Sequence, residues 1–220
     1  MDPDARFRDL TVGEFVDRLA SPAPVPGGGS AAAVAGSLGA ALVAMVASLS
    51  DRPRYAAHAA LHAEAGEAGR QLADRFLALA DEDSAAYAGY GAAMKLPRGT
   101  EAETAERMGA IRAAARHASE VPFRTVEACR ELVGLAESLA GRCNVNAASD
   151  LEVASLLAVA ASHAAAANVM TNLPSIGDEA LAASLRSRTE KLVDEIDGLA
   201  AQARTTVHGG EARDPLPATP

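Results

Sequence analysis

An aspartate near the middle of the chain lies on a helix face that the sequence predicts to be buried. Phe76, Ala80, Asp83 and Tyr87 are spaced four, three and four residues apart, so they share one side of a helix. Burial would raise the pKa of the Asp83 carboxyl group, and a nearby cation would lower it. Asp83 is therefore the first candidate for a general acid or base; the alternative is a buried aspartate with a purely structural role.

A glycine-rich loop is the second feature that indicates chemistry. The segment Pro26-Gly27-Gly28-Gly29-Ser30 contains three consecutive glycines, which let another group come very close to the main chain. Ser30 is predicted to cap a helix that continues to residue 50 without a charged side chain. The start of such a helix presents unpaired N–H groups and a partial positive charge, which suit an anion. We expect the loop to contact a ligand; the alternative is a plain connector.

Two helices with small residues at every fourth position are expected at the centre of the fold. The first follows the glycine loop, and the second covers about residues 153–173, after a polar loop at residues 143–150. Both lack formal charges, which is typical of helices inside a core. The small residues are Ala32, Gly36, Ala40, Ala44 and Ser48 in the first helix and Ala154, Ala158, Ser162 and Ala166 in the second. In the first helix, an adjacent stripe of larger apolar side chains consists of Leu38, Leu42, Met45 and Leu49.

The rest of the chain is also predicted to be helical, because no window shows the alternating β-branched pattern of strands. Capping boxes at Thr11 with Glu14, Thr100 with Glu103, and Ser149 with Glu152 mark three helix starts. Pro122 is expected to kink or divide the helix that starts at Thr100. We predict an all-α bundle of long helices around the two charge-free ones, a single domain over residues 1–207, and a disordered tail over 208–220.

Composition narrows the class of protein. The net charge of −9 argues against nucleic-acid binding, which needs a basic face. The charged N-terminus lacks the apolar segment of a secretory signal, and only two cysteines are present, so we expect a cytoplasmic protein. A membrane span is disfavoured because the apolar helices consist mostly of Ala, Gly and Ser. His58 and His62 are four residues apart without a third ligand, so we expect surface positions and no metal site.

These motifs, in this order, resemble the formiminotetrahydrofolate cyclodeaminase / methenyltetrahydrofolate cyclohydrolase family over about residues 10–200. The residues that carry the resemblance are Thr11-Val12-x-Glu14-Phe15, Pro26 to Ser30, Asp83 with Tyr87, Lys95-Leu96-Pro97, and Asn144 to Leu151. The resemblance implies an all-α homodimer or larger oligomer that handles one-carbon units on tetrahydrofolate, here as a stand-alone domain. The folate derivative would be the substrate, and neither a metal nor another cofactor would be required.

The chemistry that the resemblance implies takes one of two forms. In a cyclodeaminase (an ammonia-lyase), N10 of the folate attacks the formimino carbon on N5 and ammonia leaves. In a cyclohydrolase, water attacks the methenyl carbon between the same two nitrogens. Both reactions need proton transfer, for which carboxylates are suited. The implied catalytic residues are Asp83, Glu14 and Asp150, and the implied substrate-binding residues are Gly27, Gly28, Gly29, Ser30, Tyr87, Lys95, Asn144 and Asn146.

Other readings of these residues stay open at this stage. Glu14 could serve only its capping box, and Asp150 could be only an acidic residue favoured by a helix N-terminus. Two further functions also fit the pattern. The chain could be a non-catalytic helical scaffold whose small-residue stripes serve oligomerisation, or a binding protein for a different carboxylated ligand.

Overall fold

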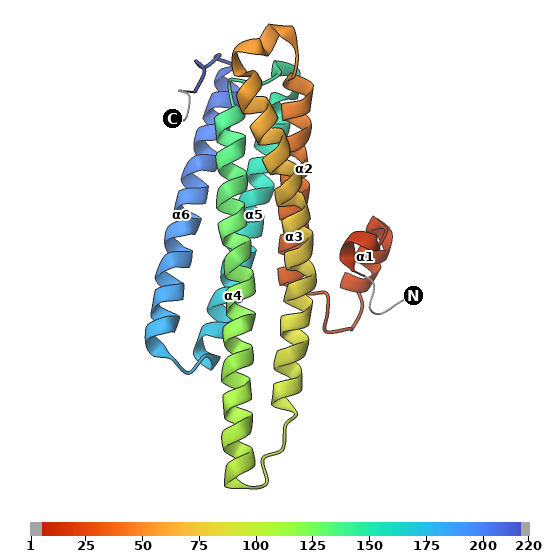
Figure 1. Ribbon diagram of the computed structural model, residues 1–220, viewed down its shortest axis with the longest axis vertical. Helices are drawn as coiled ribbons and strands as arrows, with labels where there is room; N and C mark the ends of the chain where they lie inside the picture. Colours follow the sequence, from red (N-terminus) through yellow and green to blue (C-terminus); the bar gives the residue numbers. More distant parts are fainter. Residues whose placement is uncertain (1–5, 217–220) are drawn as a thin grey trace.

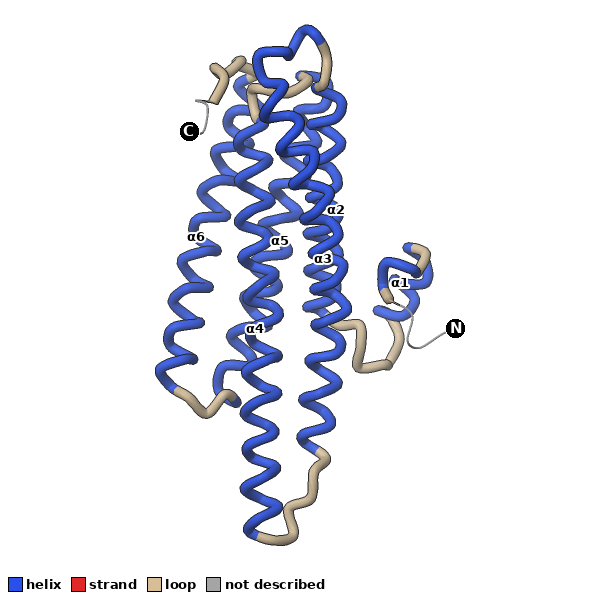
Figure 2. Tube along the Cα trace, in the orientation of Figure 1, coloured by secondary structure: helices blue, strands red, loops and turns tan. Residues whose placement is uncertain are grey.

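The structure is a computed structural model, and it describes residues 6–216. Over these residues every regular element is a helix and no strand occurs, which confirms the all-α prediction (Figure 2). The α-helices are α1 Val12–Leu19, α2 Gly28–Ser50, α3 Ala59–Met94, α4 Glu101–Leu139, α5 Ala148–Asn172 and α6 Glu179–Gly209. Short 3-10 helices are η1 Phe7–Asp9, η2 Pro53–His58, η3 Val145–Ala147 and η4 Leu173–Ser175.

The five long helices α2 to α6 form one elongated bundle, and α1 stands beside it (Figure 1). α2 packs against α3 and α5, while α4 packs against α3, α5 and α6. The hairpin of α3 and α4 extends beyond the ends of the other helices, whereas η2, the α4–α5 loop and the end of α6 gather at the opposite end (Figure 1). A ligand site in this fold therefore lies either along the bundle or at one of these ends.

Small residues let α2 approach its neighbours closely, as the four-residue repeat predicts. A Cβ atom added to Gly36 would lie 2.5 Å from the Phe76 ring, and one added to Gly69 of α3 would lie 2.9 Å from the carbonyl oxygen of Ala40. A Cβ atom at Gly39 would lie 3.1 Å from the carbonyl oxygen of Ala154 in α5. α2 thus contacts the second small-residue helix, α5, and α3 packs just as closely on another side of α2.

Two predicted helix caps are wrong. α2 begins at Gly28, with Gly27 as N-cap, because the Ser30 hydroxyl is directed to α3 instead of to its own helix. α5 begins at Ala148 without a side-chain cap, because the chain enters it through η3. The early start places Asp150 inside α5, so only α2 of the two central helices is free of charge.

The other predicted starts are confirmed, but one predicted break is absent. Thr11 and Thr100 close complete capping boxes at the starts of α1 and α4. α4 continues without interruption through Pro122, which is buried. Proline removes one helical hydrogen bond, and the packing of α4 against three other helices holds the helix together across that position.

The C-terminal segment differs from the predicted disordered tail. α6 continues through His208, and the next residues fold back onto the α4–α5 loop, where the Arg213 N–H donates to the carbonyl oxygen of Gly141 at 2.9 Å. The Arg213 guanidinium also pairs with Glu137 at 2.7 Å, which holds the segment in place. The last predicted tail residues, 217–220, lie outside the described part of the chain.

Three large apolar side chains of α2 are exposed, although the sequence predicts a helix inside the core. Leu38 is 57% exposed, Met45 39% and Leu49 38%. By length and composition alone, Gly28–Ser50 and Val145–Ser175 are apolar enough to cross a membrane. This is weak evidence for a span, because 56% of the α2 window is already buried inside the bundle, as in the core helix of a soluble protein.

Candidate active site

A cavity of about 380 Å³ opens where the first turn of α2 meets α3 and the end of α5. It is lined by Pro24, Val25, Gly27, Gly28, Gly29, Asp83, Ala86, Tyr87, Tyr90, Ala118, Asn168, Thr171, Asn172 and Ser175. Asp83 is the only acidic residue in this lining, which contains no lysine, arginine or histidine. A mostly uncharged cleft of this size, with a single carboxyl group and several amide and hydroxyl groups, has the character of a small-molecule site.

The Asp83 carboxyl group is held at the start of α2 by a hydrogen bond from Ser30. The Ser30 Oγ–H lies 3.0 Å from Asp83 Oδ2, 3.1 Å from the Ala80 carbonyl oxygen and 3.1 Å from the Ser84 hydroxyl. Ser30 is completely buried. The Ser30 hydroxyl carries one proton, which it shares between the Asp83 carboxyl group and the Ala80 carbonyl oxygen, and the Ser84 hydroxyl can donate to Ser30 Oγ.

Gly29 leaves the space that the carboxyl group occupies. A Cβ atom at this position would lie 2.1 Å from Asp83 Oδ1 and 2.5 Å from its Cγ. Any other residue at position 29 would therefore displace the Asp83 side chain. This contact gives a physical reason for a glycine directly before Ser30, which the sequence alone attributed to ligand binding.

Burial raises the pKa of the Asp83 carboxyl group, although hydrogen bonds from the Ser30 side chain and backbone oppose the shift. Desolvation disfavours the charged form, whereas both hydrogen bonds favour it. The net result is a carboxyl group that exchanges its proton at higher pH than an exposed aspartate. This is the property required of a group that must alternate between base and acid near neutral pH.

Four polar residues at the end of α5 and in η4 complete the cavity, and the sequence analysis did not select them: Asn168, Thr171, Asn172 and Ser175. Asn168 Nδ2 donates to the Ala164 carbonyl at 3.0 Å and Asn172 Nδ2 to the Ala118 carbonyl at 2.7 Å, which fixes the orientation of each amide. The four residues are spaced three, one and three positions apart, which places their side chains on one helix face. A polar face at the end of an otherwise apolar helix is the signal that could have identified them.

The structure brings together some of the predicted site residues. Gly27, Gly28, Gly29, Asp83 and Tyr87 all line the cavity. Tyr87 is 55% exposed, so it lies at the cavity mouth and not in the core. Ser30 lies behind the carboxyl group as its hydrogen-bond donor.

The predicted carboxylates Glu14 and Asp150 lie elsewhere. Glu14 closes the capping box of α1, and hydrogen bonds from the Thr11 backbone and side chain lower its pKa. Asp150 is in the first turn of α5, eighteen residues before Asn168, which corresponds to about 27 Å along the helix. Periodicity alone gives the face of a helix and not the distance between helices, and α2 and α5 run in opposite directions, which separates their N-terminal loops.

The remaining predicted contacts also lie outside the cavity. Lys95 is exposed just beyond the end of α3, twelve residues after Asp83 and therefore about 18 Å away along the helix. Asn144 has a structural role, because its N–H donates to Ser50 Oγ at 2.8 Å and its side-chain oxygen accepts from the Asn146 N–H at 3.1 Å. Within one chain, Asn144 therefore ties the α4–α5 loop to the end of α2.

Comparison with known proteins agrees with this geometry. The family model described as formiminotransferase-cyclodeaminase matches residues 11–191. The chain belongs to this family. The match extends from the capping box of α1 into α6, so it includes the whole cavity. The family resemblance seen in the sequence motifs is thereby confirmed.

Individual relatives within the family carry two different names. The chain is 37% identical over 194 residues to a methenyltetrahydrofolate cyclohydrolase of Methylorubrum extorquens, and the match covers 88% of this chain and 90% of that protein. It is 34% identical over 185 residues to the formimidoyltransferase-cyclodeaminase of Gallus gallus, of which it spans only about a third (34%). A solved structure of a formiminotetrahydrofolate cyclodeaminase from Thermotoga maritima superposes with a TM-score of 0.84 at 27% identity, covering 92% of this chain and 98% of that one.

Among the residues that the structure describes, no group of three or more His, Cys, Asp or Glu side chains is placed to hold a metal ion.

Proposed function

We propose that this chain is an enzyme acting on the one-carbon bridge between N5 and N10 of tetrahydrofolate derivatives, with methenyltetrahydrofolate cyclohydrolase as its first activity. The observation that carries the proposal is the single proton-exchanging carboxyl group, Asp83, in a cleft lined by glycine backbone and amide side chains. The cyclohydrolase reaction is placed first because the relative of that name matches over nearly its whole length. The same match supports a soluble, cytoplasmic enzyme.

In the proposed reaction, Asp83 first acts as a base. Its carboxylate accepts a proton from water while the water oxygen attacks the cationic methenyl carbon, which gives a neutral tetrahedral adduct. Asp83 then returns this proton to N5 as the bond between carbon and N5 breaks. The hydroxyl proton of the adduct is released to solvent, so the products are 10-formyltetrahydrofolate and one proton. The raised pKa of Asp83 suits both steps.

Cyclodeamination is the second candidate, favoured by the similarity to the Thermotoga maritima structure. N10 would attack the formimino carbon, and protonated Asp83 would supply the proton that the departing nitrogen needs to leave as ammonia. The two reactions pass through similar tetrahedral carbons, so one carboxyl group in one cleft can serve both. We assign no catalytic role to Glu14 or Asp150, because within one chain neither side chain lines the cavity.

The substrate is proposed to lie between the glycine loop and the end of α5. The backbone of Gly27 to Gly29 would contact either the pterin edge or the glutamate carboxylate of the folate, and Tyr87 would cover the open side. Asn168 and Asn172, held by their own hydrogen bonds, would present amide oxygens to the ligand. No metal or other cofactor enters this mechanism.

We further propose that the protein is a homodimer. The exposed side chains Leu38, Met45 and Leu49 of α2 are accompanied by Val153 (45%) and Leu156 (50%) on the adjacent helix α5. A second copy packed on this side would remove them from water. Light scattering during gel filtration should give twice the chain mass, and Leu38→Glu should shift it toward the monomer. A monomeric wild-type protein at micromolar concentration would contradict the dimer.

The activity is tested with the near-ultraviolet absorbance of the methenyl chromophore. Purified protein should accelerate loss of the signal from 5,10-methenyltetrahydrofolate, and Asp83→Asn should lower the rate by about 10²- to 10⁴-fold, the usual contribution of a general base. Asp74→Asn is the matched control, because Asp74 lies on the same helix but is exposed and only pairs with Arg8. Dialysis against EDTA should not change the rate.

Appearance of the same signal from 5-formiminotetrahydrofolate tests the second reaction. If neither signal changes faster than it does without protein, the proposal is rejected. A non-catalytic scaffold would then not bind reduced folate in calorimetry, whereas competition by unrelated dicarboxylates would indicate a binding protein for a different ligand.

A further inference from the structure

A second cavity, of about 350 Å³, lies at the end of the bundle where η2, the α4–α5 loop and the end of α6 meet. Its polar and charged lining residues are Arg54, Tyr55, His58, Arg142 and Glu211 with Thr206. It is separate from the Asp83 cavity. Ala148 of α5 lines the second cavity and Asn168 lines the first, and twenty residues of helix correspond to about 30 Å.

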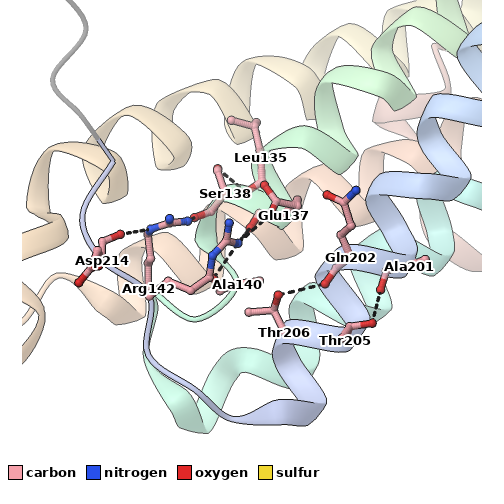
Figure 3. Close-up of polar contacts among 11 residues, drawn as sticks. Leu135, Glu137, Ser138, Ala140, Arg142, Ala201, Gln202, Thr205, Thr206 and Asp214 are labelled. Carbon is pink, nitrogen blue, oxygen red and sulfur yellow. Dashed lines mark hydrogen bonds and ion pairs between the residues drawn. The ribbon is translucent and has the colours of Figure 1, made fainter.

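Arg142 is a buried cation in the wall of this cavity. It is only 7% exposed. Its Nε donates to the Asp214 carbonyl oxygen at 2.6 Å and its Nη1 to the Ser138 carbonyl oxygen at 3.0 Å (Figure 3). Both partners are uncharged carbonyl groups. Among the described residues, no carboxylate oxygen forms an ion pair with Arg142 within 4.0 Å.

Three acidic residues near this cavity could neutralise the Arg142 guanidinium, but none of them forms an ion pair with it. Glu137 pairs with Arg213 at 2.7 Å. Asp214 offers Arg142 its backbone oxygen, and Glu211 is an exposed residue of the cavity rim. A buried guanidinium without an ionic partner is costly, because burial removes hydration that hydrogen bonds to neutral groups only partly replace.

Histidine side chains beside Arg142 leave further polar groups unsatisfied. His62 is 4% exposed, so the surface position expected from the sequence is wrong, and its Nε2 contacts the Arg142 carbonyl oxygen at 2.8 Å. The Nδ1 atoms of His58 and His62 are both buried without a hydrogen-bond partner among the described residues. Buried polar atoms in proteins nearly always have partners, so the orphaned Nδ1 atom of His58, which lines the cavity, indicates a missing partner there.

Arg54 adds a second guanidinium at the cavity, with its Cζ atom 5.3 Å from the centre of the Tyr55 ring. The lining therefore carries two guanidinium groups and one imidazole against one exposed carboxylate. Burial, followed by the charge of Arg213, lowers the pKa of Arg142, while the charges of Glu137 and Asp214 oppose this shift. Burial, followed by the charges of His62 and Arg142, lowers the pKa of His58, while the charge of Asp214 opposes it.

We propose that this cavity is a second ligand site, which binds the carboxylate or phosphate group of a small metabolite between Arg142, Arg54 and His58. Guanidinium groups bind both anions through paired N–H donors, and Arg142 has donors beyond the two that hold it in the wall. The C-terminal residues Gly210 to Ala212 form part of the cavity wall. A bound anion would therefore also hold the C-terminal segment against the α4–α5 loop.

The test measures binding of inorganic phosphate and of glutarate to the full chain by calorimetry, at ionic strength held constant with NaCl. We expect saturable binding of at least one of them, weakened at least tenfold by Arg142→Gln and severalfold by Arg54→Gln. Arg52→Gln is the matched control: it removes the same charge two residues away from Arg54, and Arg52 does not line the cavity. This control should bind within twofold of the wild type.

The preferred probe identifies the ligand class, phosphorylated or carboxylated. Saturable binding of neither probe overturns the proposal, and so does binding that both Arg142→Gln and Arg54→Gln leave unchanged. If Arg142→Gln does not fold, Arg54→Gln against Arg52→Gln decides. Asp83→Asn should bind the probe as the wild type does, which separates this site from the proposed reaction.

Discussion

Replacement of Gly29 by alanine tests whether the position of the Asp83 carboxyl group determines the rate. The added Cβ atom would lie 2.1 Å from Asp83 Oδ1, 2.5 Å from Cγ and 2.7 Å from Oδ2. Carbon and oxygen atoms that are not bonded to each other need more than 3 Å, so the carboxyl group must move by about 1 Å. This movement would stretch the 3.0 Å hydrogen bond from Ser30.

A misplacement of this size in a catalytic group costs about 100-fold in rate. We therefore expect kcat of Gly29→Ala to fall about 100-fold, which corresponds to ~2.7 kcal/mol of activation free energy. Crowding in a packed site costs about 1 to 3 kcal/mol of stability, and alanine regains up to about 1 kcal/mol by its greater helix propensity. The fold should therefore survive, with a small net loss in the free energy of unfolding.

Kinetics by methenyl absorbance and urea unfolding measure the two effects separately. Gly66→Ala is the control, because its Cβ atom would meet only ordinary contacts, 3.5 Å from the Ala47 Cβ. It should keep the wild-type kcat and unfold at the same or a slightly higher urea concentration. A Gly29→Ala enzyme with wild-type kcat would refute the assignment of Asp83 as the acid and base.

Three further outcomes follow from the same geometry. Ser30→Ala removes a hydrogen bond that lowers the pKa of Asp83, so the acidic limb of the pH profile of kcat/KM should move to higher pH, and urea unfolding should show a loss of about 1 kcal/mol. Folding raises the pKa of Asp83, so its protonated form stabilises the folded state at low pH, and this stabilisation is lost as pH rises through the folded-state pKa. Asp83→Asn should therefore have a free energy of unfolding at least as large as that of the wild type at pH 7. The difference in stability between the two proteins should vanish in acid. Burial raises the pKa of Cys129 to about 12 and of Cys143 to about 11, so both thiols should react slowly with a disulfide reagent at pH 8 in the native protein and rapidly in urea.

The sequence was informative about faces and helix starts within single elements. It placed Asp83 on the inner side of α3 and the glycine loop at the start of α2, and both are as predicted. It failed where the outcome depended on other helices. Ser30 has the residue type of a helix cap, but a carboxyl group from α3 lies within reach and its hydroxyl binds there instead. Periodicity could not reveal this, because the competing acceptor is 53 residues away in the chain.

The sequence could not show whether Glu14, Asp83 and Asp150 share one pocket, and within one chain only Asp83 lines the cavity. Each has a residue type suited to proton transfer, and each precedes or follows a recognisable motif. The separation of Asp150 from Asp83 depends on the antiparallel course of α2 and α5, because Asp150 lies in the first turn of α5 and Asp83 lies beside the first turn of α2. Glu14 lies in α1, outside both loops. The residues that do face Asp83 from α5 are amides at its C-terminal end, where a charge-based search finds nothing.

The register between α2 and α3 explains why packing and catalysis depend on the same residues. A step of seven residues along α2, from Gly29 to Gly36, is matched by a step of seven back along α3, from Asp83 to Phe76. Seven residues are nearly two helical turns, so both pairs lie on one line of contact between antiparallel helices. At one end of this line a glycine admits the Phe76 ring into the core; at the other end a glycine admits a carboxyl group to the cavity. The glycine that the core needs at position 36 thus sets the register that brings Asp83 to position 29, and a ligand-binding role is not required to explain why at least one residue of the loop is glycine.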